Sequence, residues 1–328
     1  MRFATLVEYF ERLEGTTKRL EMFDILSELF REVGAEEIAP VVYLLEEQLA
    51  PPFRGIEIGM AEKLVLRAIA KATGVDESRV LTLYKKLGDP GLVVERLKQA
   101  PARGKLTVAT VYARLMEIAE QSGEGSVERK VHGLSELLAE AGPKEARYIA
   151  RFVMGRLRLG IGDPTILDAL SKAVAGDRSL RPELERAYNL CSDLGLVART
   201  LRERGLEGIR AFRVRVGHPI RMALAERLPT AEEIIRRLGR CAVEVKIDGF
   251  RCQVHKQGDA VEIFSRNLER TTPMFPDIVE GVRRQVAARE AIFEGEAVAV
   301  NEETGEIYPF QVTVQRKRKH GIEEMARE

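Results

Sequence analysis

The chain has 328 residues, of which 45% are hydrophobic and 31% are charged, so it is long enough to form two or three globular domains with separate cores. It contains no Trp and only four His, a composition that argues against haem proteins and metal-cluster proteins. Lys and Arg number 52 against 51 Asp and Glu. Overall charge therefore gives no support to nucleic-acid binding, which would require basic residues to be sorted onto one face.

Cysteine usage and the lack of targeting segments predict a cytoplasmic protein. Cys191, Cys241 and Cys252 have no C-x-x-C spacing, so each is expected to be a small buried hydrophobe rather than a metal ligand or nucleophile. An incidental disulfide between Cys241 and Cys252 is left open. Neither a signal peptide nor an 18-residue apolar stretch is present, so we expect no membrane partner.

Residues 1 to about 212 are predicted to be helical. Apolar residues recur every three or four positions in 3–13 and 20–30, the spacing of a helix with one buried face. The same spacing predicts further helices over 61–72, 75–87, 108–120, 127–140 and 146–157. Most of these apolar positions are expected to serve only as a scaffold.

Two loops in this helical part combine arginine with glycine and lead into a helix. The candidate residues are Arg54 and Gly59 in the first loop, and Arg156, Arg158, Gly160 and Gly162 in the second. The N-terminus of a helix presents free N–H groups and a positive dipole end, which suit a phosphate, and glycine lets a DNA backbone approach closely. Two ordinary capped connections are the alternative. The repetition hints at a duplicated helical half.

The pattern changes near residue 213. Residues 213–220 are expected to be an extended linker, because Gly217-His218-Pro219 breaks helices. A short helix is expected over 231–238, followed by strands, with a hairpin turn at 256–259. The expected strands are 243–245, 250–255, 260–265, 291–293 and 296–301. Strands after an all-helical region indicate two domains, 1–212 and 213–328.

The strongest chemical signal is the segment Val-Lys-Ile-Asp-Gly-Phe-Arg at 245–251. It places Lys246 at the edge of the strand expected over 243–245. A lysine can attack the α-phosphate of a nucleotide only as the uncharged amine, so nearby cations or burial must disfavour its protonation. Lys-x-Asp-Gly alone is weak evidence, since a turn with a solvated lysine would give the same letters.

Further segments accompany the lysine. They are Phe-Ser-Arg-Asn-Leu-Glu at 264–269, Ile-Phe-Glu-Gly-Glu-Ala-Val-Ala at 292–299, Pro-Phe-Gln at 309–311 and a basic run at 316–319. In this order they resemble the adenylation domain of ATP-dependent DNA ligases, most like the archaeal replicative type. Upstream, 155–162 and 188–195 resemble the helical DNA-binding domain of the same enzymes. The resemblance implies a multidomain protein, with an all-α helical DNA-binding domain followed by an α+β nucleotidyltransferase domain that has antiparallel sheets and is truncated.

The resemblance also implies a reaction. Lys246 would be adenylated by ATP, AMP would pass to the 5′-phosphate at a nick in double-stranded DNA, and the 3′-hydroxyl would then seal the strand. ATP and Mg²⁺ are the implied cofactors. Nicked DNA is the implied partner, the sliding clamp is a further candidate partner, and DNA replication, repair, recombination and cell division are the implied roles.

Individual residues acquire roles through the same resemblance. Glu244 would accept a hydrogen bond from the adenine amino group, a solvated strand residue being the alternative. Arg251 and Arg266 would contact phosphate or ribose, because a guanidinium makes paired bonds to oxyanions. Gly249 would allow close packing against the nucleotide, and Asp248 would brace the lysine loop.

Two acidic residues and a basic run complete the expectations. Glu296 resembles the acid that holds the ribose hydroxyl or Mg²⁺, and Glu294 is a second candidate for that role. The run at 316–319 is either a solvated face or part of a track for the DNA backbone.

Other expected ligase motifs are not found in this sequence. These are the aromatic residue that stacks on adenine, a second Glu-Gly strand motif, a lysine pair reaching the α-phosphate and a C-terminal oligonucleotide-binding barrel. We therefore expect the front half of a ligase. The alternatives are a DNA-binding fragment without activity of its own, and another lysine nucleotidyltransferase of the RNA ligase or capping type. The long helical region disfavours the latter.

Overall fold

The computed structural model describes residues 1–98, 106–301 and 303–315, which group into two compact units. The first comprises Met1–Pro51, Gly55–Tyr188 and Asp193–Phe212. The second consists of residues from 213 onward, together with Pro52–Arg54 and Asn189–Ser192. In the described part of the chain no helix is long and apolar enough to cross a membrane. The basic run at 316–319 lies outside the described residues.

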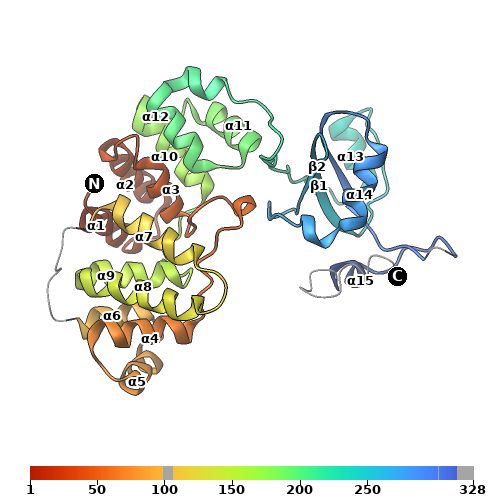
Figure 1. The fold of residues 1–328 in the computed structure, drawn as a ribbon. Helices are drawn as coiled ribbons and strands as arrows, with labels where there is room; N and C mark the ends of the chain where they lie inside the picture. Colours follow the sequence, from red (N-terminus) through yellow and green to blue (C-terminus); the bar gives the residue numbers. More distant parts are fainter. Residues whose placement is uncertain (99–105, 302, 316–328) are drawn as a thin grey trace. The chain divides into compact units, whose positions relative to one another are not determined.

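The first unit is helical, as the periodicity predicts (Figure 1). The helices up to residue 212 are α1 Phe3–Glu14, α2 Arg19–Glu32, α3 Ile38–Leu45, α4 Glu62–Thr73, α5 Glu77–Leu87, α6 Pro90–Leu97, α7 Val108–Glu120, α8 Ser126–Glu140, α9 Pro143–Val153, α10 Asp163–Ala175, α11 Arg181–Cys191 and α12 Leu194–Arg210. A short 3-10 turn, η1, covers Pro52–Arg54.

Helices far apart in the sequence pack in pairs, α2 with α10, α4 with α8, α6 with α9 and α3 with α12. Each contributes one apolar stripe to the core, where Leu6, Leu26 and Val65 are completely buried. The helix expected over 146–157 begins earlier, at Pro143, and ends at Val153. It stops there because the chain turns into a loop in which Gly155 takes φ +61°.

The second unit is built on a three-stranded antiparallel sheet. Its strands are β1 Phe250–Gln257, β2 Ala260–Phe264 and β3 Glu290–Ala297, in the order β2-β1-β3. The other elements are α13 Ala231–Leu238, the 3-10 turn η2 Thr272–Met274, α14 Pro276–Gln285 and α15 Phe310–Val314. The core of this unit joins one face of the sheet to α14 and η2, through residues such as Cys252, Val254, Ile263 and Phe275.

Several predictions for this unit are confirmed. The helix over 231–238 has the expected bounds. The hairpin between β1 and β2 turns at Gly258, whose φ of +58° suits a residue without a side chain. The fold class is also confirmed, with a helical part followed by a part that carries a small antiparallel sheet.

Other predictions are wrong. Residues 243–245 do not form a strand, and Val243 and Val245 are 92% and 87% exposed. A strand needs a hydrogen-bonded neighbour, and residues 243–245 take part in neither of the described ladders, β1–β2 and β1–β3. The two strands expected at 291–293 and 296–301 are one continuous strand, β3, which ends at Ala297. Cys241 is exposed rather than buried, whereas Cys191 and Cys252 are buried, and all three are free thiols.

Candidate functional site

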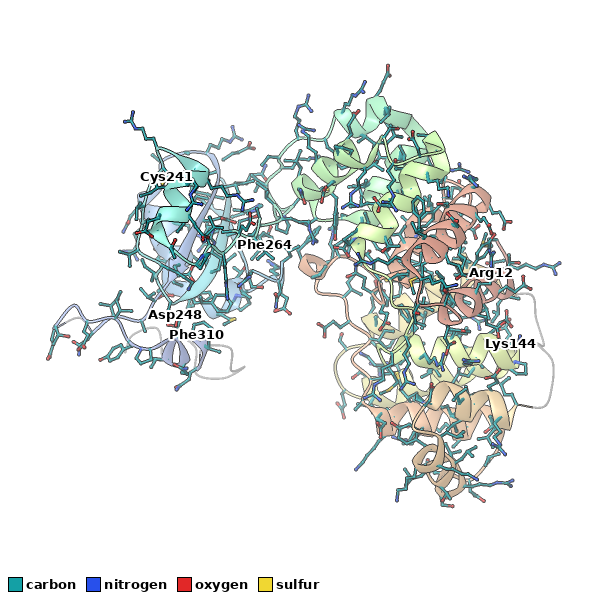
Figure 2. All side chains as sticks on the ribbon, turned by 180° about the vertical axis from the view of Figure 1, so that it is seen from behind. Arg12, Lys144, Cys241, Asp248, Phe264 and Phe310 are labelled. Carbon is teal, nitrogen blue, oxygen red and sulfur yellow. The ribbon has the colours of Figure 1, made fainter. Side chains whose placement is uncertain are left out.

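Lys246 lies in an exposed, irregular segment, 241–248, that precedes β1. Figure 2 labels the ends of this segment, Cys241 close to α13 and Asp248 at the other end of the unit. The Lys246 side chain is 88% exposed, and its Nζ lies 4.0 Å from Asp248 Oδ1. Asp248 thus lies beside the lysine as expected, although an exposed pair at this distance holds it only weakly. The burial expected around the amine is therefore not seen at Lys246.

Gly249 joins the lysine segment to the sheet. A Cβ at this position would lie 2.6 Å from the Ala297 carbonyl oxygen and 2.8 Å from Glu296 Cγ. Because both distances are far below van der Waals contact, the close approach of the end of β3 requires glycine here. The structure thus gives Gly249 a role within the fold, in addition to the nucleotide packing expected from the sequence.

Arg251 is held between two carboxylates of the neighbouring strand. The β1–β3 register places Arg251 opposite Glu296. The guanidinium forms an ion pair with Glu294 and lies 3.9 Å from Glu296 Oε2. The hydrogen bond to Glu294, followed by the charges of the nearby acids including Glu244, raises the pKa of Arg251. The structure therefore places the predicted residues Glu294 and Glu296 beside the Arg251 guanidinium, and the charge of Glu244 also acts on it.

Arg266 is placed differently from these residues. It lies in the turn that follows β2, and its side chain is exposed. Among the described residues it forms no ion pair. It therefore remains available to an anion that reaches this turn, whereas Arg251 already has carboxylate partners.

The two carboxylates of Glu294 and Glu296 suit a magnesium ion only when the phosphates of a nucleotide also bind it. The part of the chain that the structure describes has no group of three or more His, Cys, Asp or Glu residues suited to a metal. Mg²⁺ is usually held by one or two carboxylates together with substrate phosphates. Glu294 and Glu296, with side chains 32% and 22% exposed, match such a donor set when phosphates supply the remaining oxygens.

The first arginine–glycine loop of the helical unit is held by a distant lysine. Gly55 and Gly59 take φ of +65° and +60°, which favours glycine. Lys130 of α8 donates a hydrogen bond to the Ile58 carbonyl at 2.6 Å. Arg54, at the end of η1, is exposed. The Lys130 ammonium thus lies beside Gly59, and no motif in the sequence had pointed to this basic residue.

The second loop has a comparable backbone. Arg158 and Gly160 take φ of +62° and +67°, and Gly162 is the N-cap of α10. The Leu157 N–H donates to Glu47 Oε1 at 3.0 Å, which fixes the middle of the loop. Arg156, Arg158, Gly160 and Gly162 are all exposed.

The helices that follow the two loops share another feature. Each has an acidic residue in its first turn that accepts a hydrogen bond from a tyrosine of the next helix. Tyr84 donates to Glu62 at 2.6 Å, and Tyr188 donates to Asp163 at 2.8 Å. An acidic residue at this end is favoured by the helix dipole. The repeated arrangement agrees with the duplication suggested by the sequence.

A buried ionic network lies next to the second loop. Arg151 of α9 bonds to Asp89 at 2.7 Å and to Glu14 at 2.9 Å, while Arg158 of the loop lies 3.7 Å from Asp89. Burial by itself would raise the pKa of Glu14 and Asp89. Hydrogen bonds have the larger, opposite effect: Glu14 accepts from Tyr148 and Arg151, and Asp89 accepts from Arg151. The pKa of each carboxylate is therefore lowered.

Comparison with known proteins gives two family matches. The family described as "DNA ligase N terminus" matches residues 2–171. The family described as "ATP dependent DNA ligase domain" matches residues 222–328. The first match covers more than half of the chain and the second includes the lysine segment and the sheet. The chain therefore belongs to the ATP-dependent DNA ligase family.

Individual relatives agree with this assignment. A "Probable DNA ligase" from Dictyoglomus thermophilum is 54% identical over 326 residues, which are 99% of this chain and 56% of the relative. "DNA ligase 2" from Thermofilum pendens is 48% identical over 339 residues, covering 99% of this chain and 56% of its own length. "DNA ligase" from Cenarchaeum symbiosum is 46% identical over 329 residues, with 98% and 56% coverage. The chain thus spans just over half the length of these curated relatives.

Proposed function

We propose that this chain carries the nucleotide-accepting lysine and the DNA-binding part of an enzyme that seals nicks in duplex DNA. The observation that carries the proposal is the continuity between Lys246 and the Arg251 cluster. The lysine is exposed, and four residues later the chain enters β1, whose Arg251 forms an ion pair with Glu294 and lies 3.9 Å from Glu296. A nucleophile and a charged cradle for a nucleotide therefore adjoin each other along the chain.

The first step is attack by Lys246 Nζ on the α-phosphorus of ATP. A nitrogen–phosphorus bond forms, the bond to the β-phosphate oxygen breaks, pyrophosphate leaves and the amine loses a proton. We assign Glu244 to the adenine amino group, Arg251 and Arg266 to phosphate or ribose oxygens, and Glu296 to the ribose hydroxyl or the metal. Mg²⁺, held by Glu296 with the phosphates, would neutralise charge on them.

The helical unit is proposed to bind the DNA backbone. The exposed candidates on its two loops are Gly59, Arg156, Arg158, Gly160 and Gly162, and Arg54 directly precedes the first loop. Four glycines with positive φ keep these loops free of bulky side chains, and arginines stand on the second loop and next to the first. This combination supports contact with phosphates rather than with bases.

Further roles follow from nick sealing. We propose that residues 1–212 act as the DNA-binding domain and 213–328 as the adenylation domain, in a cytoplasmic protein. DNA replication, repair and recombination, and through them cell division, would require this activity. A sliding clamp is a candidate partner for such an enzyme, and the helical domain is its expected contact.

The test is the intact mass of the chain after incubation with ATP and Mg²⁺. Wild type is expected to gain the mass of one AMP, and Lys246→Ala is expected to gain none because the attacking amine is gone. Lys246→Ala should still bind nicked duplex DNA. Labelling of Lys246→Ala would show that the nucleophile is assigned wrongly. An unlabelled wild type that still binds nicked DNA would instead indicate a DNA-binding part without adenylation activity of its own.

A further inference from the structure

The two faces of β1 have opposite character. Cys252 and Val254 point into the core of the second unit. The alternate positions on the other face are polar, namely Arg251, Gln253 and His255. Gln253 and His255 are 1% and 0% exposed. Burying their polar groups destabilises the fold unless each group has a hydrogen-bond partner.

His255 connects the linker to this polar face. Its Nδ1 lies 2.9 Å from the Gly217 backbone nitrogen, whose N–H donates to it. Because Nδ1 accepts, the ring hydrogen of the neutral imidazole must be on Nε2. Nε2 lies 2.9 Å from Gln253 Oε1 and donates to it.

Both the oxygen and the nitrogen of the Gln253 side-chain amide form hydrogen bonds. Oε1 also accepts from the Ile220 N–H at 2.7 Å, and Nε2 donates to the Ile220 carbonyl at 3.0 Å. The remaining N–H donates to Glu294 Oε1 at 2.8 Å. The other oxygen of Glu294 pairs with Arg251. An unbroken chain of hydrogen bonds therefore runs from Gly217 through His255, Gln253 and Glu294 to Arg251.

We propose that Gln253 is a positioning residue that couples the segment 217–220 to the Arg251 guanidinium. Gln253 holds one oxygen of Glu294, which leaves the other oxygen aimed at Arg251. The same amide forms hydrogen bonds with the N–H and the carbonyl of Ile220. The Gln253 side chain therefore orients both the Glu294 carboxylate and the segment 217–220. A consequence for ATP binding rests on the proposed function, whereas the structural coupling between the segment 217–220 and Arg251 does not.

The test compares Gln253→Met with Gln257→Met. Gln257 is a matched control, because it also stands on β1 and donates to the opposite glutamate of β3, Glu290, at 3.1 Å, but in an exposed position. Gln253→Met is expected to shift the Arg251 side-chain NMR signal and the Gly217 and Ile220 amide signals, whereas Gln257→Met leaves them in place. Unchanged signals in a folded Gln253→Met protein would overturn the proposal.

The functional arm measures AMP transfer against ATP concentration. Loss of one charge-assisted hydrogen bond is expected to raise the half-saturating ATP concentration about tenfold in Gln253→Met. The maximal rate should change much less, because Lys246 is untouched, and a merely less stable protein would not show this split. Equal half-saturation in Gln253→Met and wild type would overturn the effect on ATP.

Failure of the proposed function can be distinguished from failure of the coupling. If wild type itself accepts no AMP, the proposed function fails for this chain, and the NMR arm alone decides the coupling. If Gln253→Met does not fold, Glu294→Gln replaces it. This variant should shift the Arg251 signal directly, and it should also shift the Ile220 amide signal, because Glu294 and Ile220 are both bonded to the Gln253 amide. An unchanged Ile220 amide signal in a folded Glu294→Gln protein would refute the coupling.

Discussion

The loops of the helical unit and the lysine segment of the second unit are all irregular and exposed, but they are held in different ways. Lys130 and Glu47 fix the backbones of the two loops, and a buried ionic network lies beside the second. Lys246 has only an exposed pair at 4.0 Å in the described structure. The backbones of the two loops are therefore held by fixed side-chain contacts, whereas the lysine segment is ordered mainly where Gly249 meets the sheet.

The largest expected effect is on the network beside the second loop. Asp89→Ala leaves Arg151 buried without a principal partner, so it should lower the free energy of unfolding by about 3–5 kcal/mol. Chemical denaturation measures this change. Glu203→Ala is the control, because the Arg199–Glu203 pair is exposed and should cost less than about 1 kcal/mol. Equal losses in the two variants would mean that the network does not stabilise the unit.

The two units should respond to acid in different pH ranges. Burial, followed by the charge of His218, lowers the pKa of His255 from 6.5 to about 4. The unfolded chain therefore takes up a proton between these values while the folded chain does not, and stability falls as pH drops from 6.5 to 4. The expected loss is about 3 kcal/mol.

Hydrogen exchange in the second unit between pH 7 and 4 measures this loss, and His255→Gln should flatten the profile. The first unit should lose stability only at lower pH. Glu14 and Asp89 have pKa values in the folded state that are lowered from 4.5 and 3.8, so their contribution to stability is complete above about pH 5 and is lost as pH falls through and below these ordinary values. Identical acid profiles for the two units would contradict this assignment.

A smaller effect concerns the junction of the lysine segment with the sheet. Gly249→Ala would place a methyl group 2.6 Å from the Ala297 carbonyl oxygen, and should destabilise the second unit by about 1–3 kcal/mol. Gly295→Ala is the matched control, since a Cβ at Gly295 meets nothing within 4 Å. Thermal unfolding of the two variants provides the comparison. A Gly249→Ala variant as stable as Gly295→Ala would show that the junction is loose.

The smallest effect is expected for DNA binding. Arg158→Ala should weaken binding of nicked duplex DNA by about 1 kcal/mol and reduce the slope of log affinity against log salt by about one, if its guanidinium contacts a phosphate. Titrations at several salt concentrations measure both quantities. Arg199→Ala removes an arginine that already pairs with Glu203 on α12, and should leave the slope unchanged. An unchanged slope in Arg158→Ala would remove this residue from the interface.

Features that depend on near neighbours along the chain could be predicted from the sequence. Apolar spacing predicted the helix at 108–120 with its observed bounds, because one helical face is set by residues three and four apart. The short helix at 231–238 was also predicted with its observed bounds. The hairpin at Gly258 followed from local turn chemistry. The lysine segment and its accompanying motifs were sufficient to indicate the family.

Contacts between residues far apart in the sequence became known only from the folded chain. The β1–β3 register brings Glu294 to Arg251, 43 residues earlier, and helix packing brings Lys130 to Ile58, 72 residues away. Residues 243–245 have the composition of a strand, but they lack a described neighbour with which to pair. Composition and periodicity report what a segment could bury, whereas hydrogen-bond partners and ion pairs depend on where the rest of the chain is folded.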